Sequence, residues 1–211
     1  MIRRFTPVTT AILIVITLVW LYEAAIGAPN SDQKMVSLGA IMPWIFERHE
    51  YWRLVAAMFL HGGWLHWAAN SWALYQLGTL YEALFGSGRF ALVYFVTGIG
   101  ASIASTLAHH GPAVGASGAI FGILGAFIFS IRRSPQYRHQ PWTRGLVSQL
   151  MFWIAVNIII GLSLPFIDNT AHIAGLVIGL LLGFLPHRVP PPPPGGMVIE
   201  VPPSAPPQNQ P

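Results

Sequence analysis

Apolar residues gather in six long stretches along the chain, and short polar, Gly-containing or Pro-containing breaks separate them. The stretches cover residues 9–27, 64–85, 90–108, 117–131, 145–164 and 169–185. A helix needs about 20 apolar residues to cross a hydrocarbon core of about 30 Å, and most of these stretches are long enough. The pattern predicts an all-α membrane protein with six transmembrane helices.

Composition supports a membrane protein and narrows its chemistry. The chain has 211 residues, of which 54% are hydrophobic and 9% are charged, whereas soluble domains contain about 25% charged residues. The chain has no Cys, which excludes disulfide bonds, thiolate zinc sites and a cysteine nucleophile. A net charge of +4 in such a chain is attributed to membrane topology, so we expect no nucleic-acid partner.

The basic residues divide unevenly between the two sides that six spans would create. One side holds Arg3, Arg4, Arg89, Arg132, Arg133, Arg138, Arg144 and Arg188, and the other holds Lys34, Arg48 and Arg53. Because cytoplasmic segments are enriched in Lys and Arg, the larger group predicts that both termini face the cytoplasm. The first stretch exceeds the roughly 7 to 15 apolar residues of a signal peptide, so we expect it to be retained as a helix.

Two segments outside the six stretches differ from them in composition. Residues 28–60 form a long outer loop that mixes aromatic and charged groups, and we expect this loop to lie in the headgroup layer. Residues 189–211 are Pro-rich and predict a disordered cytoplasmic tail. The six-helix domain is therefore expected within residues 1–188.

Polar side chains gather where the even-numbered helices begin. His66 and Asn70 lie near the start of the second stretch, Ser117 opens the fourth, and Asp168 and His172 lie at the start of the sixth. All three helices would enter the membrane from the outer face, so these side chains are expected at one depth. Polar groups are costly inside a membrane, which makes each of them a functional candidate.

The fourth stretch is short. The 15 residues from Ser117 to Ile131 span about 22 Å at about 1.5 Å per residue, which is less than the core thickness of about 30 Å. Ser117 is therefore expected several ångström below the outer surface. Residues 111–116 are expected as non-helical backbone, which membranes tolerate only where protein buries it or it lines a wet cavity.

Small residues form stripes on the fourth and sixth helices. These residues are Gly118 and Gly122 on the fourth helix and Gly175, Gly179 and Gly183 on the sixth. Such stripes let helix backbones approach closely in lipid. On this evidence alone, Ser117 is one more packing residue.

His172 supports a second interpretation of Ser117. It lies three residues before Gly175 and points along the same seam. If the two helices meet through their stripes, His172 comes within hydrogen-bond range of Ser117. A serine needs an adjacent base to act as a nucleophile, and neutral imidazole is suited to that role. The helix N-terminus adds unpaired N–H groups that suit an oxyanion.

His66 and Asn70 are four residues apart, so they share one face of the second helix. Two side-chain donors beside the backbone N–H of Ser117 would form an oxyanion hole. The alternative is that they bond the backbone or each other and only hold the helices together. His61 is interpreted as a brace for the loop that leads into this helix.

Five segments together resemble the rhomboid family of intramembrane serine proteases. They are Trp52-Arg53, H-G-G-W-L-H-W-A-A-N at 61–70, Y-E-A-L-F-G-S-G-R at 81–89, G-A-S-G at 115–118 and D-N-T-A-H-I-A-G at 168–175. The G-A-S-G motif is weak by itself, but the combination with the other segments is highly specific, and the order, spacing and helix assignment of all five are similar to the six-helix rhomboid core. The resemblance covers about residues 9–185.

The resemblance implies a Ser-His dyad that cleaves transmembrane substrates near their outer membrane boundary. In this sequence it makes Ser117 the nucleophile and His172 the general base, with His66, Asn70 and the Ser117 N–H as oxyanion donors. It implies supporting positions at Gly115, Gly118, Phe121 and Gly175.

Other positions are expected to hold the fold. Trp52, Arg53 and Glu82 match structural elements of the family. Many relatives have Tyr where this chain has Phe121, so we expect the ring to stack on His172 without contributing a hydroxyl. Asp168 is interpreted as a helix N-cap and is left out of the dyad.

Two other functions are open to this sequence. An inactive rhomboid-like protein could bind transmembrane helices without cleaving them, although such proteins normally lack the serine or the histidine. Alternatively, a group of histidines could bind haem or a metal: His61, His66, His109, His110 and His172. We expect a protease without cofactor or metal, acting in the lipid bilayer of a bacterial cytoplasmic membrane. The sequence does not specify the substrate or the oligomeric state.

Overall fold

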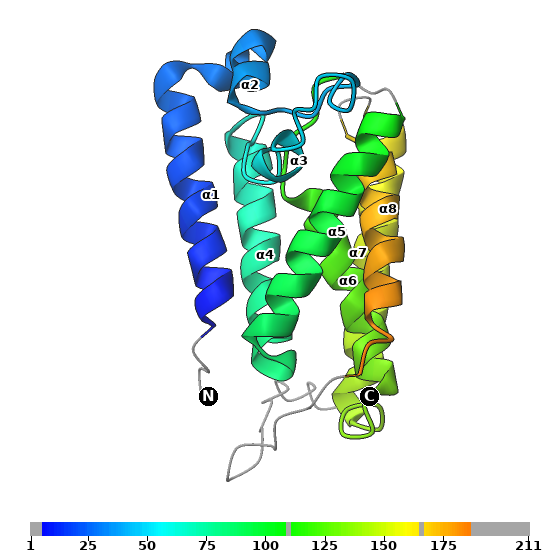
Figure 1. Cartoon of the computed structure of the whole chain (residues 1–211). Coiled ribbons are helices and arrows are strands. Elements are labelled where there is room, and N and C mark those ends of the chain that lie inside the picture. The colour runs from blue at the N-terminus through cyan, green and yellow to red at the C-terminus, as the bar shows by residue number, and fades with distance from the viewer. Residues whose placement is uncertain (1–5, 109–110, 165–166, 187–211) are drawn as a thin grey trace, which may run out of the picture.

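The computed structural model describes residues 6–108, 111–164 and 167–186, and this part of the chain is helical apart from its connecting loops. Six helices are long: α1 (Pro7–Ile26), α4 (Trp64–Phe85), α5 (Ser87–Leu107), α6 (Ser117–Arg133), α7 (Pro141–Ser163) and α8 (Asn169–Leu182). They lie side by side in one bundle (Figure 1). The prediction of an all-α protein is confirmed for the described residues. The Pro-rich tail, His109 and His110 lie outside them.

Three helices in the described part are long and apolar enough to cross a membrane, namely α1, α5 and α7. The apolar helix α8 is shorter, with 14 residues. The six-span count therefore stays a prediction. Local sequence explains where several helices begin. Pro7 and Pro141 stand in the first turns of α1 and α7, where the missing N–H of proline has no helical partner to lose.

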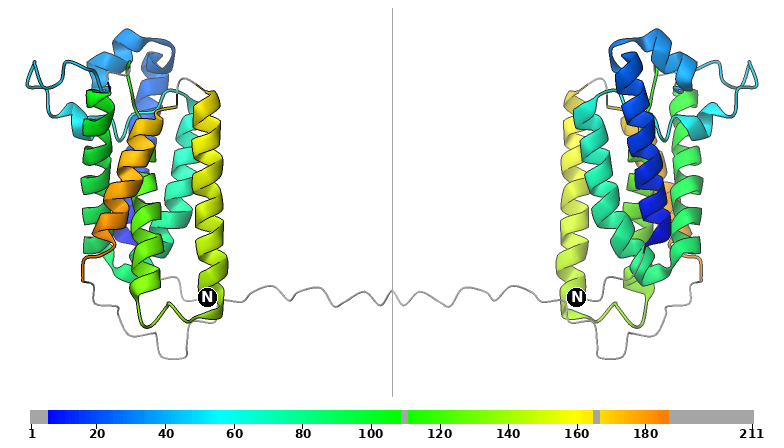
Figure 2. Two further views of the ribbon diagram at one scale, coloured as in Figure 1. Left: turned by 90° about the vertical axis from the view of Figure 1, so that its right-hand side faces the viewer. Right: turned by 90° about the vertical axis from the view of Figure 1, so that its left-hand side faces the viewer.

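The helices α4, α6 and α8 run in the same direction through the bundle. Their N-terminal ends point toward the end of the molecule that carries α2 (Asp32–Leu38) and α3 (Arg53–Ala56), at the top of Figure 1. The α6 ribbon begins lower than the α4 and α8 ribbons, as both Figure 1 and Figure 2 show. This arrangement agrees with the expectation that three polar helix starts face one side and that α6 starts at greater depth.

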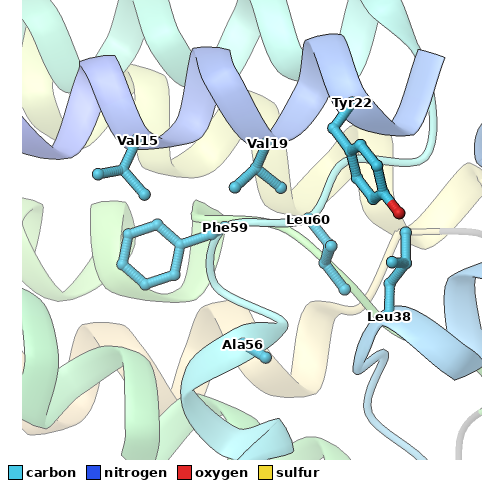
Figure 3. Close-up of a pocket in the computed structure, with 7 residues that line it drawn as sticks. All are labelled: Val15, Val19, Tyr22, Leu38, Ala56, Phe59 and Leu60. Atoms are coloured by element: carbon cyan, nitrogen blue, oxygen red, sulfur yellow. The ribbon is translucent and has the colours of Figure 1, made fainter. Parts of the chain in front are cut away.

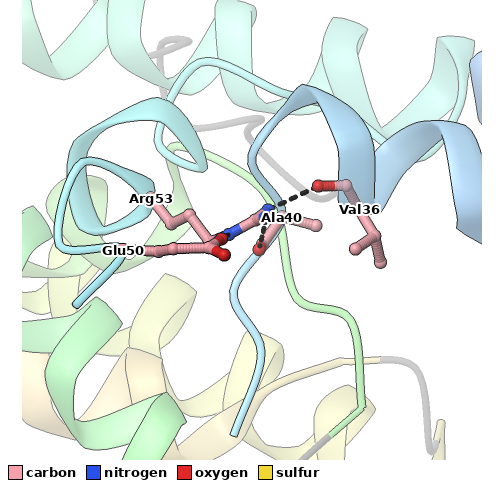
Figure 4. A network of polar contacts seen from close by, with 4 residues as sticks. All are labelled: Val36, Ala40, Glu50 and Arg53. Atoms are coloured by element: carbon pink, nitrogen blue, oxygen red, sulfur yellow. Dashed lines mark hydrogen bonds and ion pairs between the residues drawn. The ribbon is translucent and has the colours of Figure 1, made fainter. Parts of the chain in front are cut away.

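Arg53 organises the loop between α1 and α4. This loop also contains a short 3-10 helix, Ala28–Asn30. Arg53 is buried, and its side chain donates to Glu50 Oε2 at 2.5 Å, to the Val36 carbonyl and to the Ala40 carbonyl at 3.3 Å (Figure 4). A buried guanidinium needs such partners to offset its lost hydration. Arg53 thus ties α3 to the end of α2, as expected for a residue that holds the fold.

The hydrophobic core centres on α6, where 13 of the 17 residues are buried. Phe127 of α6 packs edge-on against Tyr81 and Phe85 of α4, with ring centroids 5.6 and 5.9 Å apart. Edge-to-face pairs of this kind stabilise a core beyond their buried area. The core therefore fixes the position of α6, the helix that begins at Ser117.

Glu82 joins α4 to the start of α1. Its carboxylate accepts the backbone N–H groups of Val8 and Thr9 at 3.1 and 2.8 Å, and the hydroxyls of Thr9 and Ser87 at 2.7 and 2.6 Å. These four bonds satisfy a carboxylate that is almost fully buried. The contacts agree with a structural role for Glu82.

Candidate active site

The helices α6 and α8 touch through backbone. A methyl group added at Gly175 would lie 2.0 Å from the Gly118 carbonyl oxygen, and one added at Gly179 would lie 1.9 Å from the Gly122 carbonyl oxygen. Only glycine permits this approach. The glycine stripe of α8 therefore faces α6, as the sequence predicts.

The stripe on α6 also lies against a helix that the sequence did not predict as its neighbour. A methyl group added at Gly118 would meet Ala101 Cβ at 2.5 Å, and one at Gly122 would meet Thr97 Oγ1 at 2.0 Å. Both neighbours belong to α5. The α6 stripe therefore adjoins two helices. Its backbone meets the α8 glycines, as expected, and the space beside Gly118 and Gly122 is taken up by α5. Close packing on two sides of α6 leaves its first turn little freedom to move.

This packing brings Ser117 to His172. The Ser117 Oγ and His172 Nε2 are 2.8 Å apart, which is hydrogen-bond distance. The Phe121 ring stacks on the imidazole with 4.3 Å between centroids and 5° between planes. Ser117 is the first residue of α6 and Phe121 lies one turn later, so a single helix holds both groups against His172. Phe121 and the Ser117 contact together restrict the imidazole to one orientation.

The two ring nitrogens of His172 have different surroundings. When Nε2 accepts from the serine hydroxyl, the neutral imidazole carries its proton on Nδ1. Among the described residues, Nδ1 has no hydrogen-bond partner. The Asp168 carboxylate accepts the Ala171 N–H at 3.0 Å and caps α8, as expected for an N-cap.

Gly115 brings His66 and Asn70 close to the serine segment. Its φ of 127° is a conformation that favours glycine. A methyl group there would lie 2.7 Å from His66 Nε2 and 3.7 Å from Asn70 Nδ2. The two side chains therefore lie against the backbone two residues before Ser117. Asn70 Nδ2 also donates to the His66 carbonyl at 3.1 Å, which is the helix-bracing bond of the alternative interpretation, and its amide keeps a second N–H.

His61 is enclosed behind His66. It is fully buried, its Nδ1 lies 3.3 Å from the Phe59 carbonyl, and its ring meets the His66 ring edge-on at 5.1 Å between centroids. Burial lowers the pKa of His61 to about 3, because the enclosed ring cannot be hydrated when charged. A neutral, immobilised ring suits the bracing role expected of His61.

Glu23 holds the His61 segment in place, a role that the sequence pattern did not predict. It is a fully buried acidic residue on α1, and its two carboxylate oxygens accept the His61 N–H at 3.1 and 3.2 Å. An acidic residue within an apolar stretch was the signal that could have identified it.

The histidine cluster offers no evident metal site. Within the described ranges, no group of three or more His, Asp or Glu side chains has a geometry that could hold a metal ion. His109 and His110 are outside those ranges, so the structure does not test their part in the haem or metal alternative.

The chain matches a family model described as "Rhomboid domain" over residues 48–189. It is 37% identical over 153 residues to "Rhomboid protease GluP" of Bacillus subtilis (strain 168), covering 72% of this chain and 29% of that protein. It is 38% identical over 154 residues to "RHOMBOID-like protein 1" of Arabidopsis thaliana, covering 72% and 38%. With "Rhomboid-type serine protease 2" of Emericella nidulans it shares 35% identity over 143 residues, covering 67% and 28%.

The chain thus spans well under half the length of each of these three relatives. They come from a bacterium, a plant and a fungus, so they do not favour the expected bacterial membrane over other membranes. The domain match together with the three apolar helices identifies an integral membrane protein. The chain belongs to the rhomboid family.

Proposed function

We propose that the protein is an intramembrane serine endopeptidase that hydrolyses peptide bonds of transmembrane proteins near the outer membrane boundary. The observation that carries this proposal is the 2.8 Å contact between Ser117 Oγ and His172 Nε2 at the start of α6. The names of two relatives, a rhomboid protease and a rhomboid-type serine protease, support the same activity.

In the proposed reaction, His172 Nε2 accepts the hydroxyl proton as Ser117 Oγ attacks the peptide carbonyl. The carbonyl oxygen becomes an oxyanion, which the Ser117 N–H, His66 and Asn70 stabilise as hydrogen-bond donors. The C–N bond then breaks, and His172 gives its proton to the leaving amine. A water molecule, deprotonated by His172, hydrolyses the acyl-enzyme and restores the serine.

The proposed setting is a bundle of six spans with both termini in the cytoplasm. The starts of α4, α6 and α8 then face the outer side, where α2 and α3 lie. The non-helical segment before Ser117 would form the floor of a wet cavity. Water and an unwound portion of a substrate helix would meet Ser117 from that side.

A fluorophosphonate probe tests the nucleophile in detergent-purified protein. We expect labelling of the wild type, none of Ser117→Ala, and unchanged labelling of Ser71→Ala, a control serine in the first turns of α4. Equal labelling of wild type and Ser117→Ala would refute the assignment. A wild-type protein that binds a transmembrane peptide but neither labels nor cleaves it would favour the inactive rhomboid-like binder.

Cysteine accessibility tests the orientation. We expect a cysteine introduced at Lys34 to react with an impermeant reagent added outside intact cells, and one at Gln136 to stay unlabelled. The opposite pattern would contradict the outer placement of the site.

A further inference from the structure

Two buried carboxylates join α1 to the α4 region, one at each end of α1. Glu82 of α4 binds the first turn of α1. Glu23, near the last turn of α1, binds the His61 N–H with both oxygens. Glu23 lies outside the residues 48–189 that match the family model. A carboxylate is costly to bury, so the complete burial of Glu23 needs an explanation.

The chain between His61 and α4 has little stiffness of its own. It consists of Gly62 and Gly63, and Gly63 has a φ of 153°, a conformation in which glycine is the favoured residue. No side chain caps the N-terminus of α4. His66 follows Gly63 by three residues, within the first turn. The position of that turn therefore depends on what holds His61.

Apolar packing on the α1 side of this loop is incomplete. Val15, Val19 and Tyr22 of α1 face Phe59 and Leu60 across a hollow of about 320 Å³ (Figure 3). Leu60 itself is buried in a small cluster against which Val19 and Ile26 of α1 pack, so apolar contact holds this loop to α1 only on one side of the hollow. The bonds from Glu23 supply a fixed, directional contact between α1 and the loop beside this hollow.

Contacts lead from this fixed point to the proposed oxyanion hole. The His61 ring meets the His66 ring edge-on, and the His66 ring lies under Gly115, two residues before Ser117. Beside it, Trp20 of α1 stacks on Trp67 with centroids 4.5 Å apart. The end of α1 thus contacts both the entry to α4 and its first turn.

We propose that Glu23 is a positioning residue for the oxyanion donor His66, acting through the His61 backbone N–H. The inference rests on the proposed protease function and adds α1 to the parts of the molecule on which catalysis depends. Glu23 itself does not touch the reacting atoms. Its contribution is to keep the first turn of α4 at a fixed distance from the Gly115 segment.

The test compares Glu23→Ala with Glu82→Ala, a matched control that removes the buried carboxylate at the other end of α1. Cleavage of a transmembrane model substrate is measured below the Tm of both variants. We expect Glu23→Ala to lower kcat by about 10-fold or more with KM within about 2-fold, since a displaced oxyanion donor weakens only the transition state. Glu82→Ala should lower Tm and leave kcat within about 2-fold. Equal kcat losses in both variants would overturn the inference.

Glu23→Gln keeps one carbonyl acceptor for the His61 N–H and the volume of the side chain. It should recover most of the kcat lost in Glu23→Ala, and it allows the same measurements if the alanine variant does not fold. A Gln variant with the rate of wild type, or one between wild type and Ala, supports the inference. A Gln variant as slow as a folded Ala variant overturns it.

A double-mutant cycle with His66→Ala identifies the route of the effect. If Glu23 acts through His66, replacing Glu23 in the His66→Ala background should lower kcat by less than about 2-fold further. Full additivity, or a His66→Ala variant with unchanged kcat, would overturn the inference while Ser117-dependent labelling leaves the protease proposal standing. Labelling that persists in Ser117→Ala would instead overturn the protease proposal and the inference with it.

Discussion

The helices α8 and α7 are both apolar, yet they differ in how they pack against their neighbours. Gly175 and Gly179 of α8 are buried against the α6 backbone. In α7, 17% of the most apolar 18 residues are buried. Large side chains are exposed on both helices, for example Leu162 of α7 at 78% and Leu181 of α8 at 61%. Neither hydrophobicity nor exposure therefore distinguishes α8, which places His172 against Ser117, from α7. The spacing of small residues does.

This difference has a mechanical consequence for the candidate site. Backbone contact at Gly175 and Gly179 holds α6 and α8 at close range, so the distance between Ser117 and His172 is set by two rigid helices. The helix α7 has no comparable seam, and a side-chain hydrogen bond joins it to α8: Asn169 Nδ2 donates to the Ile158 carbonyl at 3.1 Å. Changes in the seam should therefore affect catalysis far more than changes in α7.

The largest effect is expected for Gly179→Leu. Even its Cβ would lie 1.9 Å from the Gly122 carbonyl oxygen, so α8 must move away from α6. A displacement of about 1 Å at His172 would lower fluorophosphonate labelling of Ser117 by about 100-fold, and Tm should fall as well. Gly145→Leu on α7 is the matched control, because nothing lies within 4 Å of a methyl group there. Equal losses in both variants would contradict the contrast between the helices.

A smaller effect is expected for Gly122→Ala, which acts on the other side of α6. The new methyl group would meet three atoms of Thr97 on α5 at 2.0 to 2.5 Å, an overpacking that typically costs about 1 to 3 kcal/mol. Labelling and Tm should both fall, by less than for Gly179→Leu. Combining Gly122→Ala with Thr97→Gly removes the crowded atoms and should restore part of the labelling. No recovery in the double variant would show that the neighbour is not α5.

Local patterns in the sequence were enough to predict the helices and some of their ends. Hydrophobic runs and the breaks between them predicted the six long helices to within a few residues, and Ser117 was predicted as the first residue of α6. The capping role of Asp168 was predicted from its place before a helix. Each of these features depends on residues near in sequence.

Features that depend on distant contacts could not be predicted in the same way. The direction of the α6 glycine stripe depends on the rotation of α6 relative to α5 and α8, which periodicity leaves open. Glu23 bonds a residue 38 positions away, and nothing in its neighbours indicates that partner. The Arg53 contacts within the loop between α1 and α4 likewise require the folded path of the chain.

Phe121→Leu, a change between α6 and α8, should lower kcat moderately. It removes a ring stacked at 4.3 Å on His172, and aromatic pairs of this kind contribute about 0.5 to 1.5 kcal/mol. If all of that is lost from positioning the imidazole, kcat falls by about 2-fold to 10-fold. Phe121→Tyr keeps the stack and should cleave at least as fast as wild type. A Leu variant with the wild-type kcat would mean that the Ser117 contact alone orients His172.

The smallest effect on catalysis is expected for Asn169→Ala, which tests the contact between α7 and α8. The Asn169 amide lies over Gly161 of α7 and donates to the Ile158 carbonyl. Losing one such bond costs about 1 kcal/mol, which lowers Tm by about 2 to 4 °C in a domain of this size. Since α8 remains held by α6, labelling of Ser117 should stay within about 2-fold of wild type.

Asn157→Ala on α7 is the control for this variant. The exposed Asn157 amide bonds a carbonyl of its own helix, so its loss should change stability by less than about 0.5 kcal/mol and leave labelling of Ser117 unchanged. A loss of labelling in Asn169→Ala as large as that of Gly179→Leu would mean that α7, despite its exposed surface, fixes the position of His172.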